Sequence, residues 1–414
     1  MSYKKWVNAE IDKAKASALS EKLNIDAFVA FLLVSRGIDD ELAASEFLSD
    51  GCRFSSPYLL KDMDKAVKRI NRALDDGESI CIYGDYDCDG VTSTALLYTF
   101  LSALGGFVSY YIPNRATDGY GMNFKAIDKI KADGTDLIIT VDNGISSIEE
   151  AEYIYSLGMQ LIVTDHHQIG ENLPRAEAVI NPHREDNEIE FRDFAGVGVA
   201  FKLACALYDG DVEDLLEDYA DYVTIGTIGD MVPLLNENRA IVKAGLKLIN
   251  TDAKIGISAL KKSTNSKAEH FSATDVAFQI CPRINAAGRM DTANLAVDLL
   301  TCEDNEIAEY KAEQLNLENT HRHEVEEKID KDIAEIMAND RAYQTDRVIV
   351  VAGHNYHKGV IGICAAHLVE LYSKPAIVIG IDDEGNATGS ARSIDGFNIF
   401  EAISSCSDIL THFG

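Results

Sequence analysis

Residues 79–96 read SICIYGDYDCDGVTSTAL, and this stretch decides the fold. It opens with the apolar run Ile80 to Tyr83, passes through an acidic segment bounded by glycines, and ends in residues that suit the start of a helix. Asp85, Asp87 and Asp89 stand at alternate positions between the expected strand and the expected helix. Three carboxylates this close would repel one another unless a cation lay among them. The stretch therefore predicts a metal-binding loop.

The alternation of strand and helix continues beyond this loop. The expected strands are residues 80–83, 107–112, 137–141 and 161–164. The stretches between them with helical spacing are 92–104, 124–131 and 148–157. Strands and helices that alternate in this way form a parallel sheet with right-handed crossovers, so we expect an α/β fold.

The pattern divides the chain into four parts. Residues 1–75 have apolar residues at helical spacing and predict an N-terminal helical cap. Residues 76–302 hold the expected sheet and a mainly helical continuation. Residues 303–340 are helix formers whose middle is polar on every side, which is typical of a helix joining two bodies. Residues 341–414 begin a second, smaller α/β domain, which we expect to be incomplete.

Composition and targeting signals narrow the class of protein. The eight cysteines form no C-x-x-C pair, which argues against a zinc cluster and a disulfide framework. The first ten residues lack the apolar core of a leader peptide, and no run approaches the roughly 18 apolar residues of a membrane span. We therefore expect a cytoplasmic protein with reduced thiols and no membrane partner.

The charge balance weighs against a nucleic-acid substrate. Lys plus Arg number 38 and Asp plus Glu 68, which gives a formal charge of -30. Phosphate binding is usually driven by a basic surface that releases counterions. Metal ions neutralise ligating carboxylates, however, and binding depends on the local field along a groove. The charge is therefore an argument against such a substrate and does not exclude it.

Acidic residues also follow other expected strands. Asp142 opens the segment Asp142-Asn143-Gly144 after the third strand, and Asp165-His166-His167 follows the fourth. Ligands of an open parallel sheet bind beyond the carboxyl ends of its strands, where these residues would meet the first loop. Asp230 ends an apolar helical run, where an unpartnered carboxylate would be costly.

Each signal taken alone has a simpler interpretation. The acidic loop matches the opening of an EF-hand, but Leu96 stands where that loop needs a bidentate Glu, and a strand precedes it. Asn143-Gly144 is typical of a turn, and adjacent histidines are commonly surface residues. Asp230 alone suits a cap or a buried hydrogen-bonding acid. Their convergence on one face of one sheet favours the metal site.

The donor set indicates the metal and the reaction. Many carboxylates with one or two imidazoles suit Mg²⁺ or Mn²⁺ better than zinc. The carboxylates exceed the needs of one ion. Two ions about 3.5 to 4 Å apart would stabilise the attacking and the leaving oxygen of a phosphoester. We therefore expect two ions and phosphoester hydrolysis.

These segments resemble the DHH phosphoesterases. The four motifs of that family are matched in order by residues 84–90, 142–144, 165–167 and 229–230. Further segments are similar to the RecJ branch, the exonucleases specific for single-stranded DNA: residues 111–115, 119–121, 195–202, 282–290, 357–363 and 389–393. The resemblance covers roughly residues 50–414. It implies a DHH catalytic domain at 76–302 and a DHH-associated domain at 341–414.

The resemblance implies a ligand set for two ions. Asp87 and Asp142 would serve one ion, and the other would be held by Asp89, Asp142, His166 and Asp230. Asp142 would thus bridge the ions, and Asp85 is an additional or outer ligand. Some relatives use a histidine on the first ion where Tyr83 stands here, so water or Asp85 would take the place of that histidine.

The resemblance also implies catalytic and DNA-contacting residues. His167 would act with Asp142 at the scissile phosphate, as a donor to its oxygens or as a proton-transfer group. The implied substrate-binding residues are Arg115, Arg283, Asn285, Arg289, His357, Ser390 and Arg392. Arg283 and Arg289 have the alternative of structural salt bridges in a very acidic protein.

The implied activity is hydrolysis of single-stranded DNA from the 5′ end, with release of mononucleotides, in DNA repair and recombination. We expect a monomer that works with a helicase or a single-strand-binding protein. The family continues past His412-Phe413-Gly414, so we expect a C-terminally truncated chain. The alternatives are a DHH phosphodiesterase acting on short RNA, cyclic dinucleotides or pyrophosphate, and a non-catalytic replication scaffold, which would have lost metal ligands.

Overall fold

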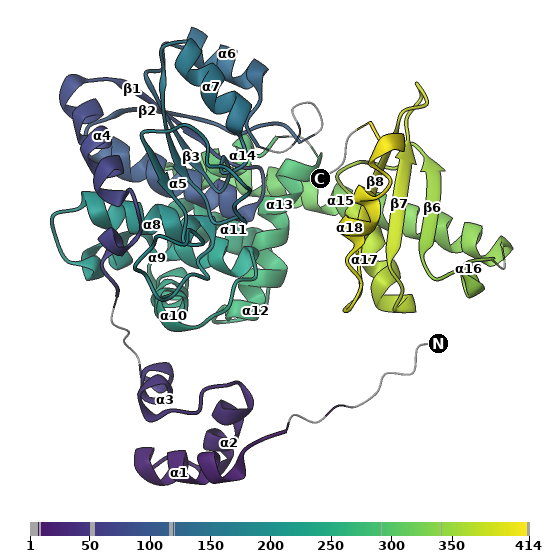
Figure 1. Cartoon of the computed structure of the whole chain (residues 1–414), viewed down its shortest axis with the longest axis horizontal. Coiled ribbons are helices and arrows are strands. Elements are labelled where there is room, and N and C mark those ends of the chain that lie inside the picture. Colours follow the sequence, from purple (N-terminus) through teal and green to yellow (C-terminus); the bar gives the residue numbers. More distant parts are fainter. Residues whose placement is uncertain are drawn as a thin grey trace. The chain divides into compact units, whose positions relative to one another are not determined.

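The computed structural model describes residues 7, 10–49, 54–115, 119, 121–290, 292–340 and 342–411. The chain forms two compact units, one from Val7 to Asn316 and one that begins at Leu317 (Figure 1). Tyr120 of the expected 119–121 motif and the segment His412-Phe413-Gly414 lie outside the described residues.

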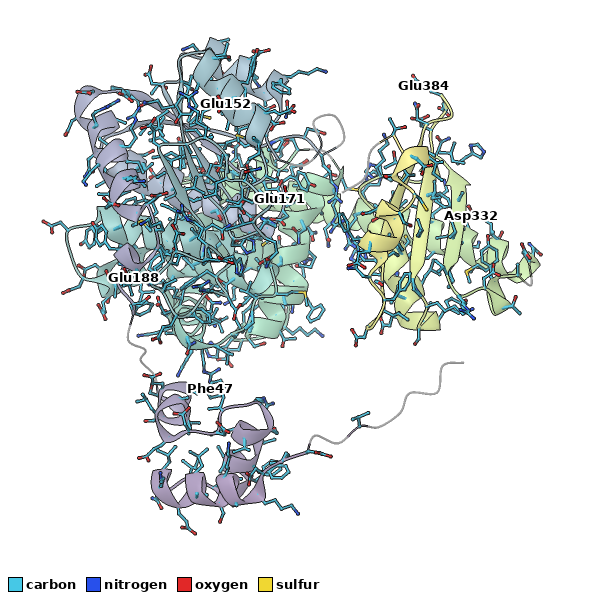
Figure 2. All side chains as sticks on the ribbon, in the orientation of Figure 1. Phe47, Glu152, Glu171, Glu188, Asp332 and Glu384 are labelled. Atoms are coloured by element: carbon cyan, nitrogen blue, oxygen red, sulfur yellow. The ribbon has the colours of Figure 1, made fainter. Side chains whose placement is uncertain are left out.

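Three short helices open the first unit. They are α1 (Lys13–Leu23), α2 (Ala27–Ser35) and α3 (Glu41–Leu48). Each begins after an aspartate whose carboxylate accepts hydrogen bonds from first-turn amides, as N-caps do. Their small core consists of Leu19, Ala30, Leu33, Ile38 and Ala44. Phe47, labelled in Figure 2, stacks on the guanidinium of Arg239 at 3.8 Å.

The next segment packs with the sheet. The turn η1 (Pro57–Leu59) leads to α4 (Met63–Asp76). Met63, Ala66, Ile70 and Ala73 of α4 belong to the large core of the first unit, and not to the core of α1 to α3. The division of the chain at residues 75, 302 and 340 stays a prediction.

The predicted parallel sheet is confirmed and has five strands. They are β1 (Ser79–Tyr83), β2 (Phe107–Tyr111), β3 (Leu137–Val141), β4 (Gln160–Thr164) and β5 (Ala178–Ile180), in the order β2-β1-β3-β4-β5. Every neighbouring pair is parallel. β5 was not predicted, because its three residues are too few to show a pattern.

The two faces of the sheet bury alternate residues, as a pleated strand requires. One face contributes Ile80, Ile82, Leu137, Ile139, Val141, Ile162, Ala178 and Ile180 to the large core. The other contributes Cys81, Tyr83, Ile138, Leu161, Val163 and Val179 to a second core, shared with α6 (Phe124–Ala132) and α7 (Ile148–Ser156). The carboxyl ends of the strands are thereby held between two helical layers.

Helices make up the rest of the first unit. α5 (Cys88–Ala103) lies on the large-core face and contacts α8 (Gly196–Leu207) and α9 (Val212–Gly229). The remaining elements are α10 (Asn236–Thr251), α11 (Ile255–Ser263), α12 (Ala273–Asp275), the π-helical turn η2 (Val276–Ile280), α13 (Cys281–Met290) and α14 (Asn294–Leu300). α5 begins four residues before the predicted helix start at 92, because Asp87 caps it.

The long helix α15 (Asn305–Asn339) runs from the end of the first unit into the second. Its polar middle is not fully exposed: Asn319 and Arg322 are buried, and Arg322 donates to Asn319 and Glu326. The second unit continues with α16 (Ala342–Thr345), β6 (Ile349–His354), α17 (Ile361–Tyr372), β7 (Ala376–Ile381), β8 (Ala387–Arg392), α18 (Ile399–Ser404) and η3 (Ser407–Ile409). β6 and β7 are parallel, and β8 is antiparallel to β7.

Within the part of the chain that the structure describes, the seven cysteines are free thiols. In that same part, no helix is both long and apolar enough to cross a membrane.

Candidate metal centre at the carboxyl edge of the sheet

The acidic loop, residues 84–90, connects β1 to α5 in a tight turn. Oδ1 of Asp87 accepts hydrogen bonds from the amides of Asp89 and Gly90, both at 3.0 Å, and so caps α5. A Cβ on Gly90 would lie 2.6 Å from the backbone of Asp85, so this close approach requires glycine. The cap fixes Asp87 at the N-terminus of α5 and Asp89 in the first turn of that helix.

Asp142 follows β3 in a backbone conformation that is rare for residues with a side chain. Its φ is +60°, and Gly144 follows at φ +105°. The amide group of Asn143 donates to the carbonyls of Val141 at 2.9 Å and Tyr83 at 3.2 Å, which ties the segment after β3 to β3 itself and to β1. These bonds fix the backbone that carries Asp142, and the hydrogen-bonded turn follows them, with the amide of Ser147 donating to the carbonyl of Gly144 at 3.1 Å.

Asp89 is held by the N-terminus of another helix. Its carboxylate accepts hydrogen bonds from the amides of Gly196 at 2.5 Å and Val197 at 2.8 Å, the first residues of α8. A Cβ on Gly196 would lie 2.6 Å from Cβ of Asp142, so α8 also packs directly on Asp142. Glycine at 196 thus lets one helix end support two carboxylates of the centre.

Asp165 orients the two histidines. Its Oδ1 accepts hydrogen bonds from the amides of His166 at 2.7 Å and His167 at 3.0 Å, and lies 2.7 Å from Nδ1 of His167. Its Oδ2 accepts from the amide of Ile145 at 2.9 Å. Burial opposes ionisation, but these bonds, above all that of His167, hold the pKa of Asp165 below its usual value. Asp165 therefore supports the centre by holding the backbone of both histidines and the ring of His167.

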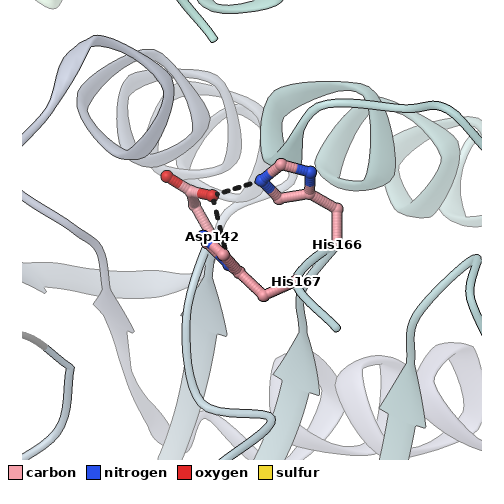
Figure 3. Close-up of side chains that lie close together, drawn as sticks. All are labelled: Asp142, His166 and His167. Atoms are coloured by element: carbon pink, nitrogen blue, oxygen red, sulfur yellow. Dashed lines mark ion pairs between the residues drawn. The ribbon is translucent and has the colours of Figure 1, made fainter. Parts of the chain in front are cut away.

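The side chains converge around Asp142 (Figure 3). Nε2 of His166 lies 3.1 Å from Oδ1 of Asp142 and 3.8 Å from both Asp89 and Asp230, and Nδ1 of His167 lies 4.0 Å from Oδ1 of Asp142. Three sets of donor atoms each lie within 4.8 Å of one another: Asp85, Asp87 and Asp142; Asp89, His166 and Asp230; Asp142, His166 and His167. Asp142 belongs to two of these sets.

The chemistry of these donors fits divalent cations. Oδ1 of Asp85, Oδ1 of Asp142 and Nε2 of His166 are buried without a hydrogen-bond partner among the described residues. Orphaned polar atoms of this kind are costly unless a ligand meets them. Oxygen donors dominate the set, as Mg²⁺ and Mn²⁺ prefer. The residues therefore fit the two ions expected from the sequence.

Electrostatics give the same indication. Burial, together with the charge of Asp87, raises the pKa of Asp85 to about 8 and that of Asp230 to about 6. Burial also raises the pKa of Asp89 and Asp142 well above the usual range. Burial, with the charge of His167, lowers the pKa of His166 to about 4, so this imidazole is neutral and able to bind a metal. The carboxylates of the centre outnumber its one charged imidazole, that of His167, and a cation would supply the missing positive charge.

An open cavity of about 280 Å³ adjoins the centre. His167 and Asp165 line it together with Gly144, Ser147 and Glu150. The side chain of His167 is 44% exposed, whereas that of His166 is 11% exposed. His167 is therefore the histidine that a substrate can reach.

The remaining predicted residues of the first unit lie around the acidic loop. Arg115 stacks over the ring of Tyr86 at 5.1 Å. Asn285 accepts a hydrogen bond from the amide of Cys88 at 2.8 Å. Arg283 donates to Asn316 at 3.0 Å and to the carbonyl of Gln279 at 2.6 Å. Arg289 carries a charge that acts on Tyr86.

The predicted residues of the second unit form their own group. His357 accepts from the amide of Gly359 at 3.1 Å, at the start of α17. Arg392 donates to Ser390 at 3.2 Å, and a Cβ on Gly362 would meet both side chains at about 3 Å. Ser390 and Arg392 of β8 therefore lie beside the N-terminal turn of α17.

Sequence reasoning missed two supports of the centre. Asp165 was noted in the third motif without a role, although a buried acid next to two histidines is a signal for an orienting carboxylate. The amides of Gly196 and Val197 were also missed. Glycines at 196 and 198 opening an apolar helix were the available signal for a helix end close to a ligand.

Two stretches of the chain match family models. Residues 79–227 match the N-terminal domain of the DHH family, and residues 345–414 match the DHHA1 domain. The two matches fall on the five-stranded sheet with its helices and on the second unit.

Relatives cover most of the chain. It is 43% identical to the single-stranded-DNA-specific exonuclease RecJ of Bacillus subtilis (strain 168) over 412 residues, which are 99% of this chain and 52% of that protein. It is 37% identical to the protein of the same name from Escherichia coli (strain K12), over 83% of this chain and 62% of that protein. The chain thus spans about half the length of the Bacillus relative.

Solved structures show the same fold. A crystal structure of exonuclease RecJ bound to manganese matches with a TM-score of 0.74 at 33% identity, over 87% of this chain and 89% of that one. RecJ from Thermus thermophilus in complex with Mn²⁺ matches with a TM-score of 0.81 at 30% identity, over 97% of this chain and 57% of that one.

Proposed function

Because this chain belongs to the RecJ group of the DHH family, we propose that it is a metal-dependent exonuclease that hydrolyses single-stranded DNA. On this proposal it works from the 5′ end and releases mononucleotides. The observation that carries the proposal is the position of Asp142 at the sheet edge. It forms one donor set with Asp85 and Asp87, and its Oδ1 lies 3.1 Å from Nε2 of His166, which belongs to the set of Asp89, His166 and Asp230. A carboxylate that reaches both sets suits the two-ion hydrolysis of a phosphodiester.

We infer that the ions are Mn²⁺ or Mg²⁺ and that Asp142 bridges them. Asp87, with Asp85 as a further donor, would hold one ion; Asp89, His166 and Asp230 would hold the other. When bound, the ions would supply positive charge for the attacking and leaving oxygens of the phosphodiester. Tyr83 is buried in the core beneath, with its hydroxyl donating to the carbonyl of Gly121, so Asp85 supplies the extra donor on this side.

His167 is the residue we assign to the scissile phosphate. Oδ1 of Asp165 already accepts two amide hydrogens, and an ionised carboxylate only accepts, so Nδ1 of His167 carries a hydrogen toward it. Burial lowers the pKa of His167, but the bond to Asp165 outweighs burial and raises it overall. The imidazolium can therefore donate from Nε2 to a phosphate oxygen or to the leaving oxygen.

The proposed substrate contacts answer the objection raised by the charge. Exposed acids such as Glu152, Glu171, Glu188, Asp332 and Glu384 are spread over both units (Figure 2). Arg115 instead stacks over Tyr86 in the acidic loop, where a phosphate would arrive, and the charge of Arg289 also acts on Tyr86. We propose that these two arginines, and Arg283, meet DNA phosphates, and that His357, Ser390 and Arg392 add contacts from the second unit.

We further propose a role in DNA repair and recombination in the cytoplasm, as a monomer, with a helicase or a single-strand-binding protein as partner. A non-catalytic scaffold of the same fold would have lost ligands. Asp87, Asp89, Asp142, His166 and Asp230 are all present in the centre.

The test follows labelled oligonucleotides. We expect 5′-labelled single strands to lose their label as mononucleotides from the first time point in Mn²⁺ or Mg²⁺, while 3′-labelled strands shorten progressively. Duplex of the same sequence should resist. Equal cleavage of duplex and single strand, or full activity of Asp142→Ala, would contradict the proposal.

A further inference from the structure

Asn285 contacts the acidic loop at the first residue of α5. The chain separates Asn285 from Cys88 by 197 positions, yet Oδ1 of Asn285 accepts a hydrogen bond from the backbone amide of Cys88 at 2.8 Å. Cys88 is 1% exposed and lies between Asp87 and Asp89. The bond is therefore made to the backbone that carries two of the proposed metal ligands.

This amide needs a partner from outside the loop. The first amides of a helix have no intrahelical acceptor. Oδ1 of Asp87 accepts hydrogen bonds from the amides of both Asp89 and Gly90. The backbone carbonyl of Asp87 accepts one from the amide of Val91. The amide of Cys88 is left to Asn285. Without Asn285, the buried amide would stay unsatisfied or draw the carboxylate of Asp87 toward itself, away from the metal.

The helix that presents Asn285 is adapted to this contact. α12, η2 and α13 follow one another without a break, and the π-helical turn η2 ends with the amide of Cys281 donating to the carbonyl of Val276. The turn precedes Pro282, which has no amide hydrogen and would clash with a carbonyl of a regular α-helix. The helix can thus pass the proline and place its next turns against the loop.

Gly288 shows how close this packing is. A Cβ at position 288 would lie 2.2 Å from the carbonyl oxygen of Tyr86. One turn of α13 therefore touches the loop at Tyr86 through Gly288 and at Cys88 through Asn285. Both contacts are to backbone, so they restrain the course of the loop itself.

We propose that Asn285 is a positioning residue of the metal centre, which fixes Asp87 and Asp89 by holding the amide of Cys88. This replaces the DNA contact expected from the resemblance, and it rests on the proposed metal centre. A phosphate oxygen is an acceptor and would need the Nδ2 donor of Asn285, whereas the bond to Cys88 uses the Oδ1 acceptor. The two roles therefore depend on opposite ends of one amide.

Two substitutions separate these roles. Asn285→Leu keeps a similar volume and removes the acceptor, whereas Asn285→Asp keeps the acceptor and removes the donor. Gln279→Leu is the matched control. It removes a side-chain amide from the same continuous helix, and this amide bonds Asp275 and not the loop. Circular dichroism and thermal unfolding establish that each variant is folded.

The first measurement needs no metal. Hydrogen–deuterium exchange of metal-free protein should be faster in peptides containing Cys88 for Asn285→Leu, and unchanged for Asn285→Asp and Gln279→Leu. The second measurement is Mn²⁺ affinity by electron paramagnetic resonance without DNA. We expect the dissociation constant to rise about 10- to 100-fold in Asn285→Leu, the usual effect of losing a support of a metal ligand. The other two variants should bind like the wild type.

The opposite result identifies a DNA contact. If Asn285→Leu keeps wild-type exchange and Mn²⁺ affinity but raises KM for single-stranded DNA, the positioning role is wrong. If Asn285→Leu does not fold, Gly288→Ala decides: it must weaken Mn²⁺ binding, and wild-type affinity would overturn the proposal. A wild-type protein that binds no Mn²⁺ would reject the metal centre, while the exchange comparison would still test Asn285.

Discussion

Oδ1 of Asp165 lies 2.7 Å from Nδ1 of His167, and the same oxygen accepts the amides of both histidines. Asp165→Asn keeps the shape of the side chain but removes the charge that holds the imidazole protonated. The side-chain nitrogen of the new asparagine also cannot accept a hydrogen bond from a backbone amide. We expect kcat on single-stranded DNA to fall about 10- to 100-fold with little change in KM, as for other residues that orient a working group.

The matched control is Asp128→Asn. Asp128 accepts a hydrogen bond from the hydroxyl of Tyr153 at 2.7 Å at an exposed site and belongs to none of the donor sets, so the substitution removes the same charge without touching the centre's donors. Steady-state kinetics should give wild-type values for this control. Equal kcat for Asp165→Asn and the wild type would show that His167 needs no orienting carboxylate.

Metal removal should cost stability. Burial and the charge of Asp87 raise the pKa of Asp85 to about 8 and that of Asp230 to about 6, so ionising them at neutral pH opposes folding unless a cation is bound. Mn²⁺ at 100 times its dissociation constant should add about 2.7 kcal/mol to the free energy of unfolding. Thermal unfolding in EDTA and in Mn²⁺ measures this, and a variant without Asp142 should lose the shift.

Asp142 should matter more than any single phosphate contact. Asp142→Asn suits the test, because asparagine tolerates the left-handed φ of +60° at this position while losing the charge that reaches both sets of donors. We expect activity to fall by more than about 100-fold, beyond the effect of losing a supporting residue. Arg289→Ala should mainly raise KM. Nuclease assays at saturating Mn²⁺ compare the two, and a larger kcat loss for Arg289→Ala would contradict a bridging Asp142.

The sequence was sufficient for the sheet because the strands that carry the centre consist mostly of apolar residues. Residues of β1, β3 and β4 are almost all buried, so their runs stand out, and the acids at their ends are where a parallel sheet gathers ligands. The start of α5 was placed too late, because the pattern of apolar residues cannot show that Asp87 turns its carboxylate onto the next amides.

The supports of the centre could not be predicted in the same way. Asn285 meets Cys88 across 197 positions, and its neighbourhood depends on the π-helical turn before it. Arg283 bonds Asn316 and a carbonyl, where the sequence offered phosphates or acids as partners. Contacts of this kind arise from packing between distant segments, and local patterns carry no information on them.

Arg184 should be the main electrostatic support of the sheet edge at β5. It is buried and bonds Asp62 at 2.7 Å, the carbonyl of Val179 at 2.7 Å and both carboxylate oxygens of Asp186. Arg184→Met leaves Asp62 charged and without this partner. We expect the free energy of unfolding at pH 7, measured in urea, to fall by about 3 kcal/mol.

The pH dependence of this loss follows from Asp62. Burial raises its pKa, but the bonds to Lys65 and Arg184 outweigh burial and lower it overall. Because the pKa of Asp62 is lower in the folded protein than the unfolded value of about 3.9, its ionised carboxylate stabilises the fold at pH values above about 3.9. This stabilisation is lost as the pH falls through the folded pKa. The difference in free energy of unfolding between wild type and Arg184→Met should therefore narrow below about pH 4.

Arg175→Met, which breaks an exposed pair with Glu152, is the control and should cost under about 1 kcal/mol at either pH. A gap that stays constant on acidification would mean that Arg184 acts by packing alone.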